Sequence, residues 1–316
     1  MASPANTVLV SNSIGNREDL SDIIFRVAAE DTPFISNIGK DQAKAVFTEW
    51  QTEALASPTI NANLEGNTFA IGAGNFTTRV GNYTQIVTKA FGVSRTEEIV
   101  RKGGRTSEVN RQKILKGLEC RRDFEFSVIG NNPSRVDNGT NARLAGGALA
   151  WITTNGTFGS GGANGGFSGG IVSAATNGTQ RALTETLVKA VMSTAFSNGA
   201  HLSQAYMGPV QKQEWSAFTG IANLRKEVGG SEMATIIGAA DVYVSDFGVI
   251  QLIPHPYGLT RDVLIIDPKM WAVAVLDGWK TVALANTADS DQYAITFEAT
   301  LMARNQLGGA AIRDLN

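Results

Sequence analysis

The sequence predicts an α+β protein, and three observations support this fold class. Apolar residues recur at helical spacing in several separate segments, while alternating apolar and polar residues, which are typical of strands, dominate from residue 241 onward. No repeat with a period of about 20 to 50 residues is present, which excludes a solenoid. A chain of 316 residues that is 43% hydrophobic can fill one large core or two closely packed ones.

The N-terminal part is predicted to form an amphipathic helix and then a strand. Asn16 can cap a helix over residues 16–31 whose apolar residues fall on one face: Leu20, Ile23, Ile24, Val27 and Ala28. The helix is expected to end at Asp31-Thr32-Pro33, because the residue before a proline avoids helical geometry. In residues 45–50, Val46, Thr48 and Trp50 alternate with Ala45, Phe47 and Glu49, as side chains on the two faces of a strand do.

The segment from residue 51 to 82 is too poor in apolar residues to bury itself. It holds only seven large apolar residues in 32 positions: Leu55, Ile60, Leu64, Phe69, Ile71, Phe76 and Val80. Folded back against the alternating run 83–93 as a long hairpin, it would project about 50 Å, whereas the expected radius of gyration is about 20 Å. A disordered loop is the alternative, but the low charge and the strand-like flanks favour a segment that lies on another molecule.

Residues 107–129 are predicted to form a long helix that Ser107 caps. Its apolar positions make a narrow stripe, and the surrounding sequence from 95 to 122 holds nine basic residues against four acidic ones. Two interpretations stay open for this basic stretch. It is either a solvated helix face, or a face that meets acidic partners such as Glu49, Glu53 and Glu65 of a neighbour or a polyanionic cargo.

The rest of the chain alternates between a glycine-rich connection, helices and strands. Residues 130–180 contain 13 of the 34 glycines and one apolar island at 144–153. A capped helix is predicted at 184–198, a strand at 205–207 and a helix that Pro209 opens. Further strands are predicted at 242–244, 249–253, 263–266, 271–276 and 292–304.

Composition excludes several classes of protein. A net charge of −2 argues against a chain whose main task is to grip nucleic acid. One cysteine and two histidines rule out a disulfide framework and a Cys/His zinc cluster. We expect no secretory signal at residues 1–10 and no transmembrane helix, because no run of 18 apolar residues occurs.

A search for catalytic chemistry gives no candidate site. No phosphate-binding G-x-x-x-x-G-K-[ST] loop is present, and Asp289 and Asp291 are not followed by the loop that an EF-hand needs. His201 and His255 lie in contexts typical of turn or packing residues rather than general bases. A hydrolase that uses carboxylates alone stays open in principle. We therefore predict a non-enzymatic building block without a cofactor or metal, whose exposed segments dock on identical neighbours.

Seven short stretches in register carry a resemblance to a known family. Among them are Arg17–Ile24, Asp31-Thr32-Pro33-Phe34, Glu49–Leu55, Asp241–Gly248 and the terminal Asp314-Leu315-Asn316. The chain resembles the major capsid (major head) proteins of tailed bacteriophages over nearly its whole length. This resemblance implies the Hong Kong 97-type capsid fold, with an N-terminal arm, an extended E-loop, a P-domain built on a spine helix, and an A-domain.

The resemblance also implies a division of the chain. Residues 1–50 would form the N-terminal arm and the lead-in to the P-domain, and residues 51–93 the E-loop. The other segments would be 94–135 as P-domain with the spine helix 107–129, 136–183 as glycine-rich connection, 184–284 as mainly A-domain, and 285–316 as the return to the P-domain.

The residue patterns and the family resemblance together predict site residues and partners. The expected inter-subunit contacts are Trp50, Glu53, Leu64, Phe69, Ile71 and Phe76, and the expected DNA-facing residues are among Arg111, Lys113, Lys116, Arg121 and Arg122. The implied partners are further copies in hexamers and pentamers, a separate scaffolding protein, a portal, and packaged double-stranded DNA held by weak non-specific contact. The implied location is the virion capsid, assembled in the host bacterial cytoplasm, with no membrane partner. Since no lysine lies between Lys44 and Lys89, a lysine cross-link through the E-loop is not expected.

Two alternatives remain at this stage. An encapsulin-like nanocompartment shell would share the fold. A glycine-rich extracellular β-adhesin, or a carboxylate hydrolase, belongs to a different class and requires a secretion signal or an acid pair that the sequence does not single out.

Overall fold

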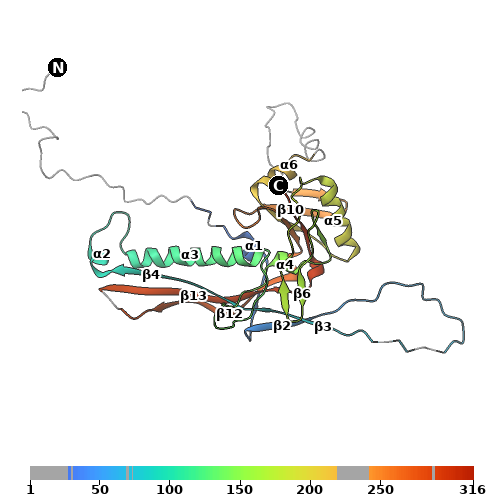
Figure 1. The fold of residues 1–316 in the computed structure, drawn as a ribbon, viewed down its shortest axis with the longest axis horizontal. Coiled ribbons are helices and arrows are strands. Elements are labelled where there is room, and N and C mark those ends of the chain that lie inside the picture. Colours follow the sequence, from blue (N-terminus) through green and yellow to red (C-terminus); the bar gives the residue numbers. More distant parts are fainter. Residues whose placement is uncertain (1–27, 30, 69–70, 73, 219–241, 287–288) are drawn as a thin grey trace, which may run out of the picture.

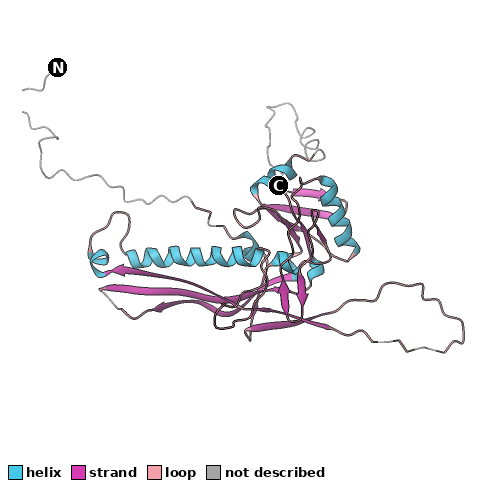
Figure 2. Ribbon diagram, viewed as in Figure 1, coloured by secondary structure: helices cyan, strands magenta, loops and turns pink. Residues whose placement is uncertain are grey.

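A long helix lies along a sheet of long strands, and a second, smaller sheet stands at one end of it (Figures 1 and 2). The computed structural model describes residues 28–29, 31–68, 71–72, 74–218, 242–286 and 289–316. Nearly all of the predicted helix 16–31, as well as Phe69, lies outside the described residues. The mixture of helices and strands agrees with the predicted α+β class.

The long sheet has four strands, of which the three longest pair antiparallel. Their order is β1 (Gly39–Gln42), β12 (Trp271–Ala283), β13 (Ser290–Ala303) and β4 (Gln85–Ser94). β13 pairs with all ten residues of β4, and β1 is parallel to β12. The β12–β13 register shifts on both sides of Asp277, so the outer half of β12 bulges.

Helix α3 (Glu108–Ile129) covers one face of this sheet over β4 and β13. The Ser107 hydroxyl accepts a hydrogen bond from the Asn110 N–H at 3.2 Å, which confirms the predicted cap. Cys120, Phe124 and Val128 are buried and follow one another at helical spacing. The Phe124 ring meets Phe297 of β13 edge to face at 5.3 Å. The predicted stripe was Leu115, Leu118, Phe126 and Ile129 with Ile114 and Cys120 alongside, but Phe126 and Ile114 are exposed, so the contact with the sheet runs through Cys120, Phe124 and Val128 instead.

The smaller sheet has six strands. Their order is β5 (Gly156–Thr157), β14 (Gly309–Ile312), β11 (Val263–Ile266), β8 (Gln204–Met207), β10 (Gly248–Pro254) and β9 (Val242–Ser245). Helices α5 (Glu185–Ser197) and α6 (Pro209–Ser216) supply Val188, Met192 and Trp215 to its core. All four residues of β11 are buried, as expected for a central strand.

The remaining elements are short. They are α1 (Pro33–Asn37), β2 (Phe47–Thr52), β3 (Thr78–Tyr83), α2 (Arg95–Ile99), α4 (Ala148–Trp151), β6 (Gly166–Ser168), β7 (Ile171–Ser173), η2 (Pro268–Met270) and η3 (Gln306–Gly308). β2 pairs with β3, and β6 pairs with β7, each in an antiparallel hairpin.

At three places, strands pair across the boundaries of the predicted segments. β4 belongs to the long sheet, so the predicted loop 51–93 ends as a separate hairpin at Tyr83. All of β12 lies in the long sheet, although it was assigned to the segment 184–284. β14 lies in the six-stranded sheet, although 285–316 was assigned to the other part. Cross-strand pairing between distant segments decides these memberships, and local patterns do not carry that information.

Candidate functional site

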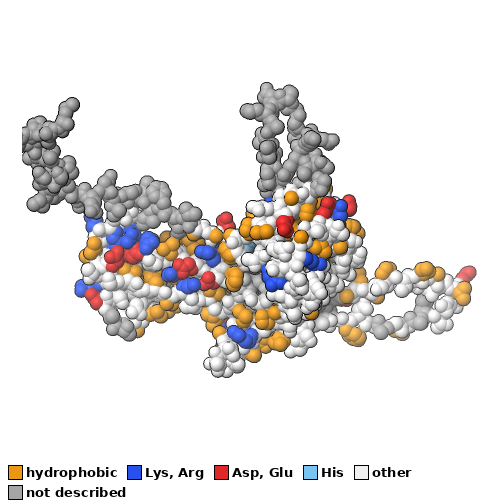
Figure 3. Space-filling model, turned by 45° about the horizontal axis from the view of Figure 1, so that its top comes forward, with side chains coloured by type: hydrophobic (Ala, Val, Ile, Leu, Met, Phe, Trp, Pro, Cys, Tyr) orange, Lys and Arg blue, Asp and Glu red, His pale blue; other side chains and the backbone are white. Residues whose placement is uncertain are grey.

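The loop between β2 and β3, residues 53–77, extends beyond the rest of the molecule and presents apolar side chains to solvent (Figures 1 and 3). Five of them are almost fully exposed: Leu55 at 91%, Ile60 at 99%, Leu64 at 85%, Ile71 at 100% and Phe76 at 88%. Glu53 is exposed as well. We call residues 53–77 the extended loop. It contains the predicted contacts Glu53, Leu64, Ile71 and Phe76, together with Leu55 and Ile60, which were not in the predicted set.

The hairpin that carries the extended loop is fixed to the body by buried contacts. The Asn82 side chain is fully buried, where it donates to the carbonyls of Gly146 at 3.1 Å and Leu301 at 2.8 Å. Its carbonyl oxygen accepts from the Gly146 N–H at 2.8 Å. All six residues of β2 pair with β3. The base of the loop is therefore rigid, although its tip has no apolar partner among the described residues.

Trp50 corrects one sequence-based prediction. It was expected to contact a neighbouring subunit, but it is only 9% exposed and lies in the subunit's own core. The indole N–H donates to the Ala303 carbonyl at 2.9 Å, and the ring lies 5.4 Å from that of Trp151. The alternation along β2 turns this side chain inward, while the composition of the segment that follows suggested exposure.

Replacing Asn82 by alanine should detach the hairpin base from the body. The substitution leaves three buried backbone groups without partners, so we expect the free energy of unfolding to fall by about 3 kcal/mol. Urea denaturation of the unassembled protein measures this loss. Asn63→Ala, in the exposed loop, is the matched control and should change it by less than about 0.5 kcal/mol. A loss below about 1 kcal/mol for Asn82→Ala would show that the hairpin is held in another way.

The basic residues of α3 do not form one free face. Arg111 pairs with Glu108 at 2.6 Å, and Lys116 pairs with Glu119 at 2.9 Å. The Lys113 ammonium lies 4.2 Å from the centre of the Tyr293 ring on β13. The local excess of basic residues therefore has partners within the subunit, as the interspersed charges in Figure 3 illustrate.

The other two predicted DNA-facing residues also contact the subunit itself. Arg121 donates to the Ser36 hydroxyl of α1 at 2.8 Å, and the Arg122 guanidinium lies 5.4 Å from the Tyr257 ring. Arg111 and Arg122 are eleven residues apart, three helical turns, and so share a side of α3. Lys113 lies on the opposite side, towards the sheet.

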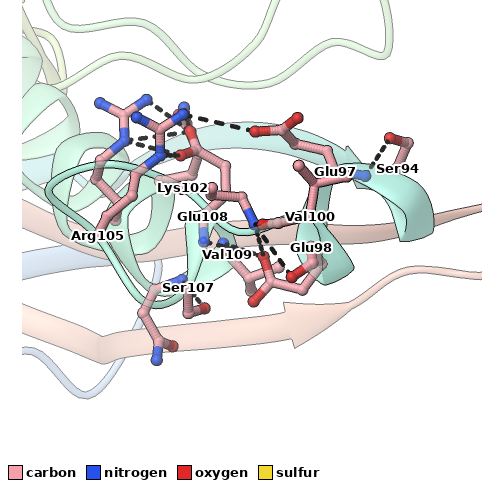
Figure 4. Close-up of polar contacts among 12 residues, drawn as sticks. Ser94, Glu97, Glu98, Val100, Lys102, Arg105, Ser107, Glu108 and Val109 are labelled. Atoms are coloured by element: carbon pink, nitrogen blue, oxygen red, sulfur yellow. Dashed lines mark hydrogen bonds and ion pairs between the residues drawn. The ribbon is translucent and has the colours of Figure 1, made fainter. Parts of the chain in front are cut away.

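A polar cluster closes the start of α3 at the far end of the long sheet (Figure 4). The Glu98 carboxylate accepts hydrogen bonds from the backbone N–H groups of Glu108 at 2.9 Å and Val109 at 3.3 Å. The Lys102 ammonium is 5% exposed and donates to the Glu98 carbonyl at 3.0 Å. The two bonds to the Glu98 carboxylate satisfy backbone N–H groups that the N-terminus of a helix otherwise leaves without a partner.

Glu108 makes this cluster sensitive to acid. Its hydrogen bonds from Arg111, and secondarily from Gln112, lower its pKa from 4.5 to about 2. Because the pKa of Glu108 is lower in the folded state, its ionised carboxylate stabilises the folded state at pH values above its pKa in the unfolded chain. This contribution is lost as the pH falls from 4.5 towards 2. The pKa of Glu98 is also lowered, with a hydrogen bond from Ser107 as the main cause.

We expect Glu108→Gln to lower the free energy of unfolding at neutral pH and to reduce its decline between pH 4.5 and 2. Denaturant titrations at a series of pH values measure both effects. Glu53→Gln, in the extended loop, is the control and should keep the wild-type pH profile. A Glu108→Gln profile parallel to that of the wild type would contradict this assignment.

A buried carboxylate joins α3, α1 and the end of β10. Glu125 is fully buried and accepts from the N–H groups of Phe34 at 2.7 Å and Ile35 at 2.8 Å. His255 Nε2 lies 3.0 Å from the same carboxylate, and the Tyr257 hydroxyl donates to the Asp31 carbonyl at 2.9 Å. His255, for which a turn or packing role was predicted, is 1% exposed. Glu125 holds the segment that leads in from the N-terminal residues.

The described residues suggest no catalytic or metal site. Gly166–Gly170 has the spacing of a G-x-S-x-G nucleophile motif, but Ser168 ends β6 in the β6–β7 hairpin instead of sitting between a strand and a helix. No group of three His, Cys, Asp or Glu that could hold a metal ion occurs in the part of the chain that the structure describes. In that same part, no helix is both long and apolar enough to cross a membrane.

Solved structures with the same architecture are phage or phage-like capsids. The capsid asymmetric unit of cyanophage A-1(L) has a TM-score of 0.68 at 11% identity, covering 95% of this chain and 97% of that one. The capsid of the native GTA particle has a TM-score of 0.62 at 9% identity, and the match covers 99% of this chain and 100% of that one. The structure from Microbacterium phage Oxtober96 has a TM-score of 0.62 at 11% identity, and the match covers 94% of this chain and 95% of that one. At these identities the similarity establishes the fold, which is the predicted Hong Kong 97 type.

Sequence comparisons add the family. The major capsid protein of Escherichia phage Phieco32 is 33% identical over 199 residues, which is 56% of this chain. The match spans about half, 53%, of the length of that relative. The SU10 major capsid protein family matches residues 4–316. Since this match includes nearly every residue, the chain belongs to the SU10 major capsid protein family.

Proposed function

We propose that this protein is the structural subunit of a phage head, in which many copies assemble into an icosahedral shell around DNA. The observation that carries the proposal is the extended loop, whose five large apolar side chains are 85–100% exposed. Several large apolar side chains left this exposed on one segment favour an interaction site. Membership of a major capsid protein family supports a second copy of the same chain as the partner.

Docking of the extended loop would contribute favourable free energy to assembly. Burial of a few hundred Å² of apolar surface at about 25 cal/mol per Å² gives several kcal/mol per subunit before ordering costs. The rigid hairpin base reduces that ordering cost, because only the loop beyond Thr52 and Thr78 has to be fixed. Closed symmetry then repeats the same contact at every subunit.

A second assembly surface is the outer edge of the six-stranded sheet. β9 is the edge strand, and Val242 and Val244 on it are 51% and 71% exposed. An apolar edge strand that no described element covers favours pairing with another chain. We place this edge against neighbouring copies within hexamers and pentamers, and the extended loop across the contact between adjacent subunits.

Further partners belong to the same proposal. A separate scaffolding protein and a portal would direct assembly in the host bacterial cytoplasm. We assign weak non-specific contact with packaged DNA to the side of α3 that carries Arg111 and Arg122. The encapsulin-like shell, the adhesin and the hydrolase are not favoured, since the matched family consists of phage major capsid proteins.

Sedimentation velocity and electron microscopy of the expressed full chain, alone and with its scaffolding protein, test the proposal. We expect closed shells of uniform size in at least one of the two conditions. A stable monomer in both conditions would contradict it.

A further inference from the structure

Five asparagine residues of the chain are followed directly by glycine: Asn138, Asn155, Asn164, Asn177 and Asn198. An asparagine in this context can lose its side-chain amide when the backbone nitrogen of the next residue attacks the side-chain carbonyl carbon. Glycine hinders this attack least, because it has no Cβ to crowd the nitrogen. The surroundings of each pair then decide which asparagine reacts, and these surroundings differ.

Asn138 lies in an exposed turn that backbone hydrogen bonds hold in one shape. Arg135 and Leu144 exchange two of these bonds, each of 3.0 Å, at the base of the turn. The Asn138 N–H donates to the Asn141 carbonyl at 3.4 Å. Gly139 has a φ of 77°, a conformation that glycine adopts without strain. Water reaches the pair, because Asn138 and Gly139 are both exposed.

The turn provides a proton acceptor for the attacking nitrogen and hydrogen-bond donors for the attacked carbonyl. The Gly139 N–H donates to the Asp137 carboxylate at 2.8 Å. The side-chain oxygen of Asn138, Oδ1, accepts from the N–H groups of Asn141 at 2.7 Å and Thr140 at 3.2 Å. A carboxylate beside the nucleophile can act as a general base, and N–H groups on the carbonyl oxygen stabilise the negative charge that develops there.

Two of the other pairs are held in ways that oppose the reaction. Asn155 is 1% exposed, and its amide nitrogen donates to the carbonyls of Leu307 at 2.9 Å and Gly309 at 3.1 Å, so the leaving group is bound. The Gly199 N–H, next to Asn198, donates to a backbone carbonyl at 2.9 Å, and a carbonyl is not a base that can take the proton.

The last two pairs lack parts of the arrangement found at Asn138. The Gly178 N–H donates to the Asp314 carboxylate at 2.8 Å, but no described N–H donates to the side chain of Asn177. Asn164 is exposed, as Asn138 is, but its side chain makes no hydrogen bond with any described residue. Asn164 is therefore the reference for an exposed pair without a base and without donors.

We propose that Asn138 is a site of self-catalysed deamidation in the folded subunit, with Asp137 as the general base. The Gly139 nitrogen forms a bond to Cγ of Asn138 and gives its proton to Asp137. When the Cγ–Nδ2 bond breaks, Asp137 returns the proton to the leaving nitrogen, which departs as ammonia. Water then opens the resulting cyclic imide to aspartate or isoaspartate. Each conversion replaces a neutral amide by a carboxylate, so the formal net charge of the subunit changes from −2 to −3.

Peptide mapping by tandem mass spectrometry, after incubation of the unassembled full chain at neutral pH, tests the proposal. We expect Asn138 to convert at least about tenfold faster than Asn164, and Asn155 to stay unconverted. Asp137→Ser keeps a hydrogen-bond acceptor but removes the base. It should slow conversion of Asn138 at least about tenfold and leave the rate at Asn164 unchanged.

The same measurement on the chain unfolded in guanidinium chloride separates the folded geometry from the sequence. Unfolding removes the contacts around Gly139 and Oδ1, so Asn138 and Asn164 should then convert at similar rates. Equal rates at these two residues in the folded protein would overturn the proposal. An unchanged rate at Asn138 in Asp137→Ser would also overturn it, as would a faster rate at Asn138 that persists in the unfolded chain.

Discussion

Deletion of residues 57–77 is expected to abolish shell assembly and to leave the subunit folded. The deletion joins Ala56 to Thr78, so Glu53–Ala56 form a four-residue connection between the paired residues Thr52 and Thr78. Loops of four residues are common in hairpins, and the anchors at Trp50 and Asn82 stay in place. Circular dichroism and thermal unfolding should match the wild type, whereas sedimentation and electron microscopy should show no shells.

A matched substitution separates the loss of apolar surface from the loss of loop length. Changing Leu55, Ile60, Leu64, Ile71 and Phe76 to serine keeps every backbone position and should abolish assembly as the deletion does. Asn61→Ser and Asn63→Ser in the same loop should leave assembly unchanged. Shells of normal size and yield from the deletion would show that the extended loop is not the docking element.

Glu125→Ala is expected to cause the largest loss of stability from a single substitution. Removal of the carboxylate leaves the Phe34 and Ile35 N–H groups and the His255 Nε2 atom unpaired in a buried site. Breaking a buried hydrogen-bonded pair by removing one partner costs about 3 to 5 kcal/mol. Urea denaturation measures this loss, and hydrogen exchange should show α1 opening before α3.

The control lies on the same helix. Glu119→Ala removes a carboxylate that pairs with Lys116 at a partly exposed position, and it should cost at most about 1 kcal/mol. Glu125→Gln should cost less than Glu125→Ala, because its amide retains one acceptor oxygen for either N–H group. Equal, small effects of Glu125→Ala and Glu119→Ala would contradict the role of Glu125 as the anchor of α1.

The features that local chemistry determines could be predicted from the sequence. Ser107 and the narrow apolar stripe specify α3, and the shortage of apolar residues in 51–82 indicates a segment that cannot bury itself. β12 was predicted to end at residue 276, but it continues to Ala283. The second half of β12 is largely exposed, and its pairing with β13 through a bulge, rather than burial, keeps it extended.

Features that depend on distant segments could not be predicted. Glu125 and His255 are 130 residues apart, and no pattern around either one indicates the other. The basic residues of α3 were counted against the acids of residues 95–122, but their contacts with Tyr293 and Tyr257 come from more than 130 residues away. Trp50 was misplaced because its inward orientation depends on the register between β2 and β3.

The central claim is that the extended loop finds its apolar partner on a second copy of the chain. Hydrogen exchange of residues 53–77, compared between unassembled subunits and purified shells, tests this claim most directly. We predict rapid exchange in the subunits and exchange slowed by at least about tenfold in the shells. Equally rapid exchange in both states, or protection already complete in isolated subunits, would contradict it.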